Sequence, residues 1–181
     1  MRVITGKARG VQLKTPEGMT TRPTTDRVKE ALFSIIQFEI PTARVLDLFG
    51  GTGQLGIEAL SRGASTAVFV DAGEPACRLI RENLKRTKLE ADAKVIRADY
   101  LDYLKRCREK FDIIFLDPPY AEVFLENALK CIAEIDILQS GGIIVTERPV
   151  GKELPWEFDG FKRSRDYKYG KTVLTIYRRN G

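Results

Sequence analysis

Residues 45–56 read VLDLFGGTGQLG, and this stretch decides the fold of the chain. A short apolar strand that contains an aspartate runs into a glycine-rich loop, and the apolar spacing of a helix follows directly. Glycines in such a loop let the backbone turn sharply and approach a ligand, toward which the first amides of the helix point. The stretch therefore predicts a strand, loop and helix that bind a nucleotide-like cofactor.

An acidic residue follows this loop at the spacing that nucleotide-binding folds use. Gly51, Gly53 and Gly56 satisfy the pattern G-x-G-x-x-G, and Asp71 comes about 20 residues after Gly51, at the end of the next predicted strand. A carboxylate in that position can hold two ribose hydroxyls. Two cofactor classes fit these features: a nicotinamide dinucleotide, and S-adenosylmethionine bound through its adenosine.

Short apolar runs alternate with helical patterns through residues 43–146, which is typical of βαβ units on a parallel sheet. The pattern predicts an α/β fold: one Rossmann-like domain over residues 1–181, with a mostly parallel seven-stranded sheet and helices on both faces. A catalytic core over 43–181 follows an N-terminal hairpin and helix extension over 1–42. The predicted core strands are 43–48, 66–70, 93–96, 111–116 and 142–146, with a closing antiparallel hairpin of 161–165 and 172–177.

The N-terminal extension has its own pattern. Residues 2–5 and 11–14 flank a turn and predict a β-hairpin. A helix is predicted to follow, started by Pro23 with Thr24 or Thr25 as its N-cap. Its predicted buried face consists of Val28, Leu32, Ile35 and Ile36.

The composition excludes several functional classes. The 181 residues are 43% hydrophobic and 30% charged, which suits one globular domain, and no apolar run approaches the roughly 20 residues that cross a bilayer. The N-terminus carries no secretion signal, so we expect a cytoplasmic protein. The absence of histidine removes histidine-dependent nucleophilic catalysis and the commonest zinc ligand. Cys77, Cys107 and Cys131 form no metal-binding or disulfide pattern, so we expect reduced thiols and no metal.

Basic residues gather at the two ends of the chain. Residues 1–29 contain seven basic and two acidic side chains, and residues 161–181 contain seven basic and one acidic, which leaves the middle net negative. Clustered Lys and Arg displace condensed counterions from phosphates, so this distribution favours a nucleic acid as partner. The alternative is that the charged ends are simply solvated.

The tetrapeptide Asp117-Pro118-Pro119-Tyr120 follows the predicted strand 111–116, at the sheet edge where open α/β sheets bind ligands. Neither proline donates an N–H, so the turn offers acceptors, the Asp117 carboxylate and the Pro118 carbonyl. Two acceptors would orient an exocyclic amine toward an electrophilic methyl group, and Tyr120 could stack on an extruded base. The motif favours S-adenosylmethionine; the alternative is a rigid turn with a capping aspartate.

Together these motifs resemble the class I S-adenosylmethionine-dependent methyltransferases that modify exocyclic amines. Over nearly the whole chain the sequence is similar to the bacterial 16S ribosomal RNA guanine-N2 methyltransferase family. The resemblance is carried by RVITG (2–6), RG (9–10), TRPTTDRVKEALF (21–33), DLF (47–49), EALSRGA (58–64) and YGKT (169–172). Gly50 and Gln54 depart from it, because the family usually has smaller or apolar residues such as alanine there.

The resemblance implies methyl transfer from S-adenosylmethionine to the N2 amine of one guanine, numbered 966, in 16S ribosomal RNA. The partner would be that RNA or the assembled small subunit, and the protein would act as a monomer without metal or membrane. The implied catalytic residues are Asp117, Pro118, Pro119 and Tyr120.

Cofactor and RNA contacts follow from the same resemblance. Asp47, Gly51 and Gly53 would face the methionine end of the cofactor, Asp71 the ribose, and Asp99 the adenine amino group. Phe49 and Tyr100 would complete the cofactor site. The residues expected to bind RNA or line the active-site mouth are Lys7, Arg9, Lys14, Arg22 and Thr24.

Three other functions remain open at this point. The Asp117 turn would equally serve a methyltransferase that acts on adenine N6 or on a glutamine side chain. The glycine loop and Asp71 alone would fit a nicotinamide oxidoreductase. A third possibility is a non-catalytic RNA-binding assembly factor that kept the fold.

Overall fold

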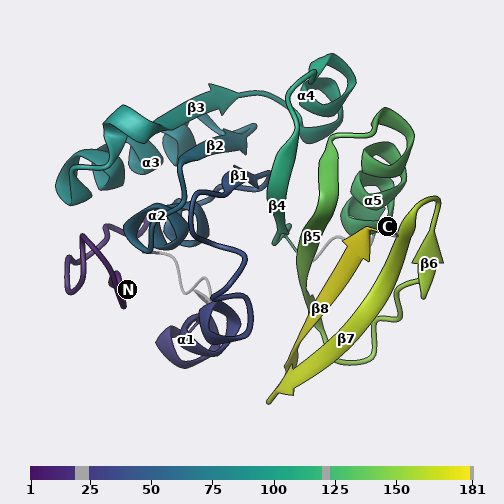
Figure 1. The fold of residues 1–181 in the computed structure, drawn as a ribbon. Coiled ribbons are helices and arrows are strands. Elements are labelled where there is room, and N and C mark those ends of the chain that lie inside the picture. The colour runs from purple at the N-terminus through teal and green to yellow at the C-terminus, as the bar shows by residue number, and fades with distance from the viewer. Residues whose placement is uncertain (19–24, 120–122, 180–181) are drawn as a thin grey trace.

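A computed structural model describes residues 1–18, 25–119 and 123–179 (Figure 1). Its strands are β1 (Arg44–Asp47), β2 (Thr66–Asp71), β3 (Ala93–Arg97), β4 (Phe111–Leu116), β5 (Leu138–Pro149), β6 (Glu157–Phe158), β7 (Phe161–Tyr169) and β8 (Thr172–Arg179). Its helices are α1 (Asp26–Ile35), α2 (Gln54–Ser61), α3 (Glu74–Thr87), α4 (Tyr100–Arg106) and α5 (Val123–Ile135), with a short 3-10 helix, η1 (Glu90–Asp92).

The strands form one mixed sheet in the order β3-β2-β1-β4-β5-β8-β7-β6. The five strands from β3 to β5 are parallel, and β8, β7 and β6 add to them antiparallel. Strand order reverses between β1 and β4, and ligands of open α/β sheets bind at such a switch point, outside the carboxyl ends of the strands. The predicted fold class is confirmed, and the switch point lies beside the glycine loop.

The sheet in the described part of the chain has eight strands instead of the predicted seven. The additional strand, β6, has two residues and pairs Phe158 with Phe161. Asp159 and Gly160 connect the pair, and Gly160 has φ +84°. Asp-Gly is a favoured two-residue hairpin turn, and here the glycine takes the positive φ, so the sequence did carry a signal for this strand.

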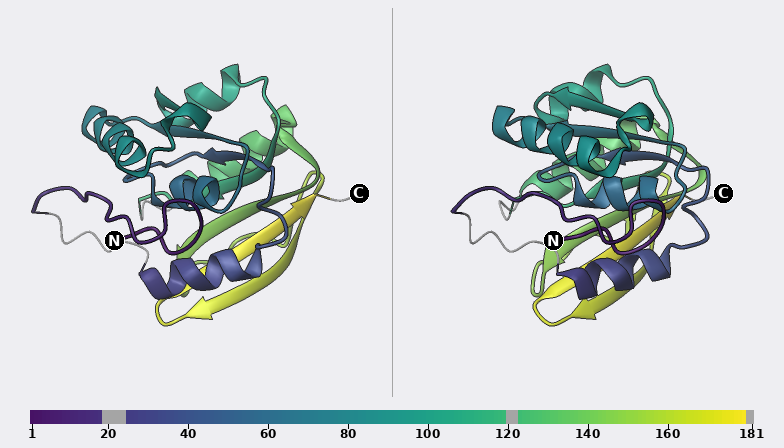
Figure 2. Two further views of the ribbon diagram at one scale, coloured as in Figure 1. Left: turned by 60° about the vertical axis from the view of Figure 1, so that its left-hand side comes forward. Right: turned by 90° about the vertical axis from the view of Figure 1, so that its left-hand side faces the viewer.

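Helices cover both faces of the sheet, as alternation along the strands requires. Val45 and Phe115 pack with α1, α2 and α3, whereas Leu46 and Ile114 pack with α4 and α5. In Figure 2, α1 lies across β8 and the N-terminal segment runs beside α2. Strands buried on both faces explain the continuous apolar runs in the sequence.

The predicted N-terminal hairpin is present in a short form. Arg2 and Gln12 form an antiparallel bridge, and Val3 N donates to Val11 O and Leu13 N to Met1 O, both at 3.0 Å. Side chains of the catalytic core take backbone bonds that a strand ladder would use. Ile4 N and Thr5 N donate to the Glu58 carboxylate, and Lys14 N donates to Asn83 Oδ1. The extension is therefore bound to α2 and α3 more than to itself.

Helix α1 begins at Asp26, directly after a predicted cap, while Pro23 and Thr24 lie outside the described residues. The side chain of Thr25 caps the helix by accepting from Val28 N at 3.2 Å, which confirms one of the two predicted caps. Val28, Leu32 and Ile36 are buried as predicted. Ile35 is half-buried, while the neighbouring Phe33 is fully buried.

Candidate functional site

The glycine loop joins β1 to α2 at the carboxyl edge of the sheet. Gly51 and Gly53 have φ of +59° and +81°, which side-chain-bearing residues rarely adopt. Gly50 N donates to Val70 O at 2.8 Å, and a Cβ on Gly50 would lie 2.7 Å from the Ile80 side chain. A Cβ on Gly51 would meet nothing closer than 4.0 Å. The loop is thus packed against the protein at Gly50 and open at Gly51, where a ligand can approach.

Asp47 ends β1 beneath this loop. Its side chain is buried, and Oδ2 accepts from Gly56 N at 3.1 Å. Burial raises the pKa of Asp47 to about 7; the Gly56 hydrogen bond lowers the pKa, and the charge of Asp71 raises it further. A cationic ligand beside Asp47 would therefore favour the ionised form of this carboxyl group near neutral pH.

Asp71 ends the neighbouring strand β2 and ties the loop to the next turn. Its Oδ2 accepts from Gly51 N at 3.0 Å and its Oδ1 accepts from Gly73 N at 2.9 Å. A carboxylate has about four acceptor positions. Asp71 can consequently keep both backbone bonds and still accept from two hydroxyls.

Asp99 follows β3 and is the N-cap of α4. Its Oδ1 accepts from Leu101 N at 2.9 Å and from Asp102 N at 3.2 Å. Next to it, Phe49 and Tyr100 lie 5.1 Å apart between ring centroids, and Phe124 of α5 lies 6.1 Å and 5.3 Å from them. Phe124 was not predicted from the sequence, although its position shortly after the Asp117 turn indicates that it lies at the same edge of the sheet.

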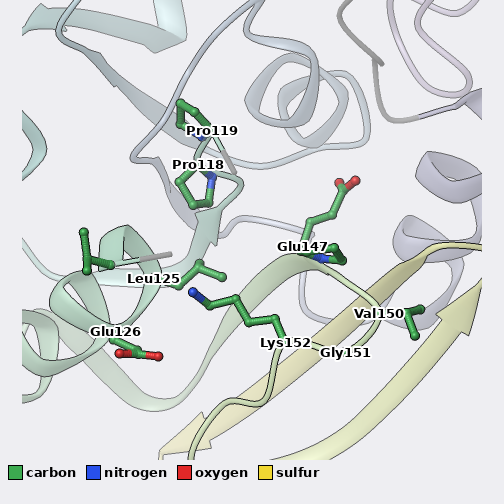
Figure 3. Close-up of a pocket in the computed structure, with 10 residues that line it drawn as sticks. Pro118, Pro119, Leu125, Glu126, Glu147, Val150, Gly151 and Lys152 are labelled. Carbon is green, nitrogen blue, oxygen red and sulfur yellow. The ribbon is translucent and has the colours of Figure 1, made fainter. Parts of the chain in front are cut away.

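The Asp117 turn follows β4, the strand next to β1 at the switch point. Asp117 and Pro118 are half-buried and Pro119 is exposed, while Tyr120 lies outside the described residues. A pocket of about 620 Å³ adjoins the two prolines (Figure 3). The other residues that line it are Val123, Leu125 and Glu126 of α5, and Glu147, Pro149, Val150, Gly151 and Lys152 at and after the end of β5.

The residues of β5 that line this pocket were not predicted either. Leu116 pairs with Thr146 across β4 and β5, so the next residue along each strand, Asp117 and Glu147, reach the same sheet edge together. The rule that placed Asp117 there also applies to Glu147, a charged residue that directly follows the predicted strand 142–146.

Buried charges fix the segment that follows β5. The Arg148 guanidinium donates to Lys152 O and, at 2.9 Å, to Asp166 Oδ2. Arg163 donates to Leu154 O at 3.1 Å and to the same carboxylate. Two guanidinium groups and one carboxylate thus hold one wall of the pocket against β7, an arrangement that no local pattern predicts.

The predicted RNA-binding residues do not all reach this edge. Lys7 and Arg9 are exposed on a turn whose Lys7 N donates to Ser61 O at 2.8 Å, at the far end of α2 from the glycine loop. Lys14 lies nearer, because Asn83 donates to both Lys14 O and Thr52 O, at 3.1 Å and 2.9 Å. Its ammonium pairs with Glu82 at 3.0 Å. Arg22 and Thr24 lie outside the described residues.

Metal clusters and membrane-spanning helices are both absent from the described residues. Within the described ranges, there is no group of three or more His, Cys, Asp or Glu side chains placed to hold a metal ion. None of the described helices has the length and apolar character needed to cross a membrane. Cys77, Cys107 and Cys131 are not joined in disulfides, as predicted.

Comparisons with known proteins agree along the whole chain. A family model described as conserved hypothetical protein 95 matches residues 1–178. The Bacillus subtilis (strain 168) protein YlbH, provisionally named an rRNA methyltransferase, is 42% identical over 100% of both chains. The "Ribosomal RNA small subunit methyltransferase D" of Escherichia coli (strain K12) is 31% identical over 99% of this chain and 90% of its own. The solved structure of Escherichia coli yhhF, provisionally described as a methyltransferase, superposes with a TM-score of 0.90 at 32% identity, covering 99% of this chain and 98% of that one.

Proposed function

This chain belongs to the conserved hypothetical protein 95 family, and on that basis we propose that it methylates the exocyclic N2 amine of one guanine in 16S ribosomal RNA. The chain is an RNA methyltransferase, and S-adenosylmethionine is its methyl donor. The observation that carries the proposal is the placement of two acceptors, Asp117 and Pro118, directly after β4, the strand that pairs with β1 before the glycine loop. Guanine 966 is the target that the family resemblance implies.

The residues at this edge fit the cofactor. Its ammonium group and ribose hydroxyls are donors, and the edge offers acceptor oxygens at Asp47 and Asp71. The buried Oε1 of Gln54, the first residue of α2, has no hydrogen-bond partner in the described part of the chain and adds a third acceptor. Phe49 and Tyr100 would give an aromatic wall for the adenine. Asp99 follows β3, which pairs with the strand that ends in Asp71, and would accept from the adenine amino group.

These residues would promote the reaction by holding the amine and the methyl donor in position. Bound S-adenosylmethionine supplies a methyl group on a sulfonium, which needs no metal and no covalent intermediate on the protein. The lone pair of an aryl amine delocalises into its ring, so the amine is a poor nucleophile. Hydrogen bonds from the amine to Asp117 and Pro118 would favour its pyramidal form and aim the lone pair at the methyl carbon. Tyr120 would stack on the extruded base.

The basic ends of the chain would bind the RNA backbone. Lys7, Arg9 and Lys14 would contact phosphates away from the reacting base, and Arg22 and Thr24 would lie near the mouth of the site. The partner is then 16S RNA or the assembled small subunit, met by a monomer in the cytoplasm.

Nucleoside analysis tests the proposal directly. Small ribosomal subunits from cells that lack this protein are incubated with the protein and labelled S-adenosylmethionine, digested, and separated into nucleosides. We expect one labelled N2-methylguanosine per subunit. Recovery of N6-methyladenosine in its place would contradict the guanine assignment and favour the adenine alternative.

Cofactor affinity is expected to rise with pH. Burial raises the pKa of Asp47 to about 7, so part of the population is protonated and neutral at that pH. A bound cation favours the charged carboxylate, so binding lowers this pKa and releases a proton. Affinity should therefore increase about tenfold from pH 6 to pH 8. Calorimetric titration with S-adenosylmethionine at both pH values measures it, and Asp47→Asn should remove the dependence. An equal dependence in Asp47→Asn would assign it to another group.

Removing the two exposed basic residues of the N-terminal turn should weaken RNA binding. The double variant Lys7→Ala, Arg9→Ala is expected to lower the slope of log affinity against log salt concentration by about one for every phosphate that these side chains neutralise. Filter binding of small-subunit RNA over a salt series gives the slope. The matched control is the double variant Lys105→Ala, Lys130→Ala, which removes one exposed lysine from α4 and one from α5. It should leave the slope unchanged. An unchanged slope in the first variant would place the RNA on another surface.

A further inference from the structure

Glu147 and Asp117 are neighbours at the carboxyl edge of the sheet. The pairing of Leu116 with Thr146 puts the two acidic residues one position further along adjacent parallel strands, which lie about 4.8 Å apart. Phe115 and Val145, two residues before them, both belong to the core beneath α1 and α2. Side chains two residues apart on a strand point to the same face of the sheet. Asp117 and Glu147 are therefore expected on the face that Phe115 and Val145 occupy.

Glu147 also belongs to the pocket beside the catalytic turn. It lines that pocket together with Pro118 and Pro119, and it is half-buried. Figure 3 shows its carboxylate extending away from Lys152, above the strand, with the two prolines above and to its left. Two residues of the acceptor turn, Pro118 and Pro119, and a second carboxylate therefore line one space, which Asp117 directly precedes in the chain.

Guanine and adenine differ in what they would present to this second carboxylate. Along its Watson–Crick edge, guanine carries N1–H next to the N2 amine, so two donors are adjacent. Adenine carries an unprotonated N1 next to its N6 amine, so a donor is adjacent to an acceptor. An ionised carboxylate only accepts hydrogen bonds. A pair of neighbouring acceptor groups thus matches guanine and opposes adenine.

We propose that Glu147 accepts the N1–H of the target guanine while Asp117 and Pro118 hold its N2 amine, so that Glu147 selects the base. This inference rests on the proposed function and names the residue that restricts it to guanine. Two oxygens give a carboxylate about four acceptor positions, so Glu147 can keep a protein partner and bind the base at once.

The test compares two bases that share the reacting amine. Small-subunit RNA is ligated from two pieces so that the methylated nucleotide carries either guanine or 2,6-diaminopurine, which keeps the 2-amino group and lacks the N1 hydrogen. The wild-type enzyme should prefer guanine by about a hundredfold or more in kcat/KM, since a site built to pair a donor rejects the analogue that lacks it. In Glu147→Gln the side-chain amide can donate to the unprotonated N1, and the preference should fall at least tenfold.

Controls separate this role from general damage. Glu157→Gln makes the same chemical change at an exposed position on β6 and should keep the wild-type preference. Glu147→Ala removes the opposing charge and should also lower the preference, and calorimetric binding of S-adenosylmethionine to each variant shows that it is folded. An unchanged preference in both Glu147 variants would overturn the inference and leave the proposed function standing. Failure of the wild-type protein to methylate the guanine RNA, both free and reconstituted into small subunits, would overturn both.

Discussion

Replacing Asp117 with alanine is expected to cut turnover by two or more orders of magnitude and to leave cofactor affinity nearly unchanged. Asp117 directly follows β4, the strand next to β1 and its glycine loop, and its carboxylate is one of two acceptors proposed for the amine. Removing one preorganised polar group from other active sites costs about 10²–10³ in kcat. Because the proposed cofactor residues lie at or after the ends of β1, β2 and β3 and do not include Asp117, binding of the donor should survive.

Single-turnover methylation of small subunits measures the first effect, and calorimetric titration with S-adenosylmethionine measures the second. Asp117→Asn keeps one acceptor oxygen and should retain more activity than Asp117→Ala. The matched control is Asp92→Ala, which removes an exposed carboxylate in η1, and we expect wild-type turnover from it. Wild-type turnover in Asp117→Ala would mean that another group holds the amine.

Replacing Glu58 with alanine is expected to destabilise the fold by about 3–5 kcal/mol. The Glu58 side chain is fully buried and accepts from Ile4 N at 2.9 Å, Thr5 N at 3.1 Å and Arg62 Nε at 3.0 Å. The ammonium of Lys29, equally buried, lies 3.6 Å from it. Burial lowers the pKa of Lys29, and the negative charge of Glu58 opposes that shift. Without the carboxylate, the two backbone N–H groups lose their acceptor. The buried ammonium keeps its hydrogen bond to Arg2 O at 2.5 Å but loses its counter-charge.

Urea unfolding followed by circular dichroism measures this loss. The matched control is Glu82→Ala, which removes the exposed ion pair with Lys14 and should change the free energy of unfolding by less than about 1 kcal/mol. The double variant Lys29→Met, Glu58→Gln removes both buried charges and should recover part of the stability. A loss for Glu58→Ala no larger than for Glu82→Ala would show that the buried cluster contributes little.

The glycine loop and the Asp117 turn were predictable because their signals are local. Gly51 and Gly53 take the positive φ that their residue type implied, and Thr25 caps α1 as a threonine before a helix does. Asp71 binds Gly51 N across 20 residues, at the spacing that indicated a ribose-binding acid. The roles of these residues toward cofactor and RNA stay predictions that the experiments above address.

Tertiary packing decided the rest. The hairpin expected near the N-terminus is shorter than predicted because Glu58 and Asn83, far along the chain, bind the backbone on either side of its bridge. Lys7 and Arg9, expected together with Lys14, lie at the other end of α2.

The sequence by itself determined which segments are strands, where the cofactor loop lies and which turn offers acceptors to an amine. Periodicity, glycine conformation and the missing N–H of proline act within a few residues, so they can be read along the chain. Only the tertiary structure placed Glu147 beside Asp117 and gathered Arg148, Arg163 and Asp166 behind the pocket. Those neighbours are set by strand register and by the burial of charges that need partners, and both depend on residues distant in sequence.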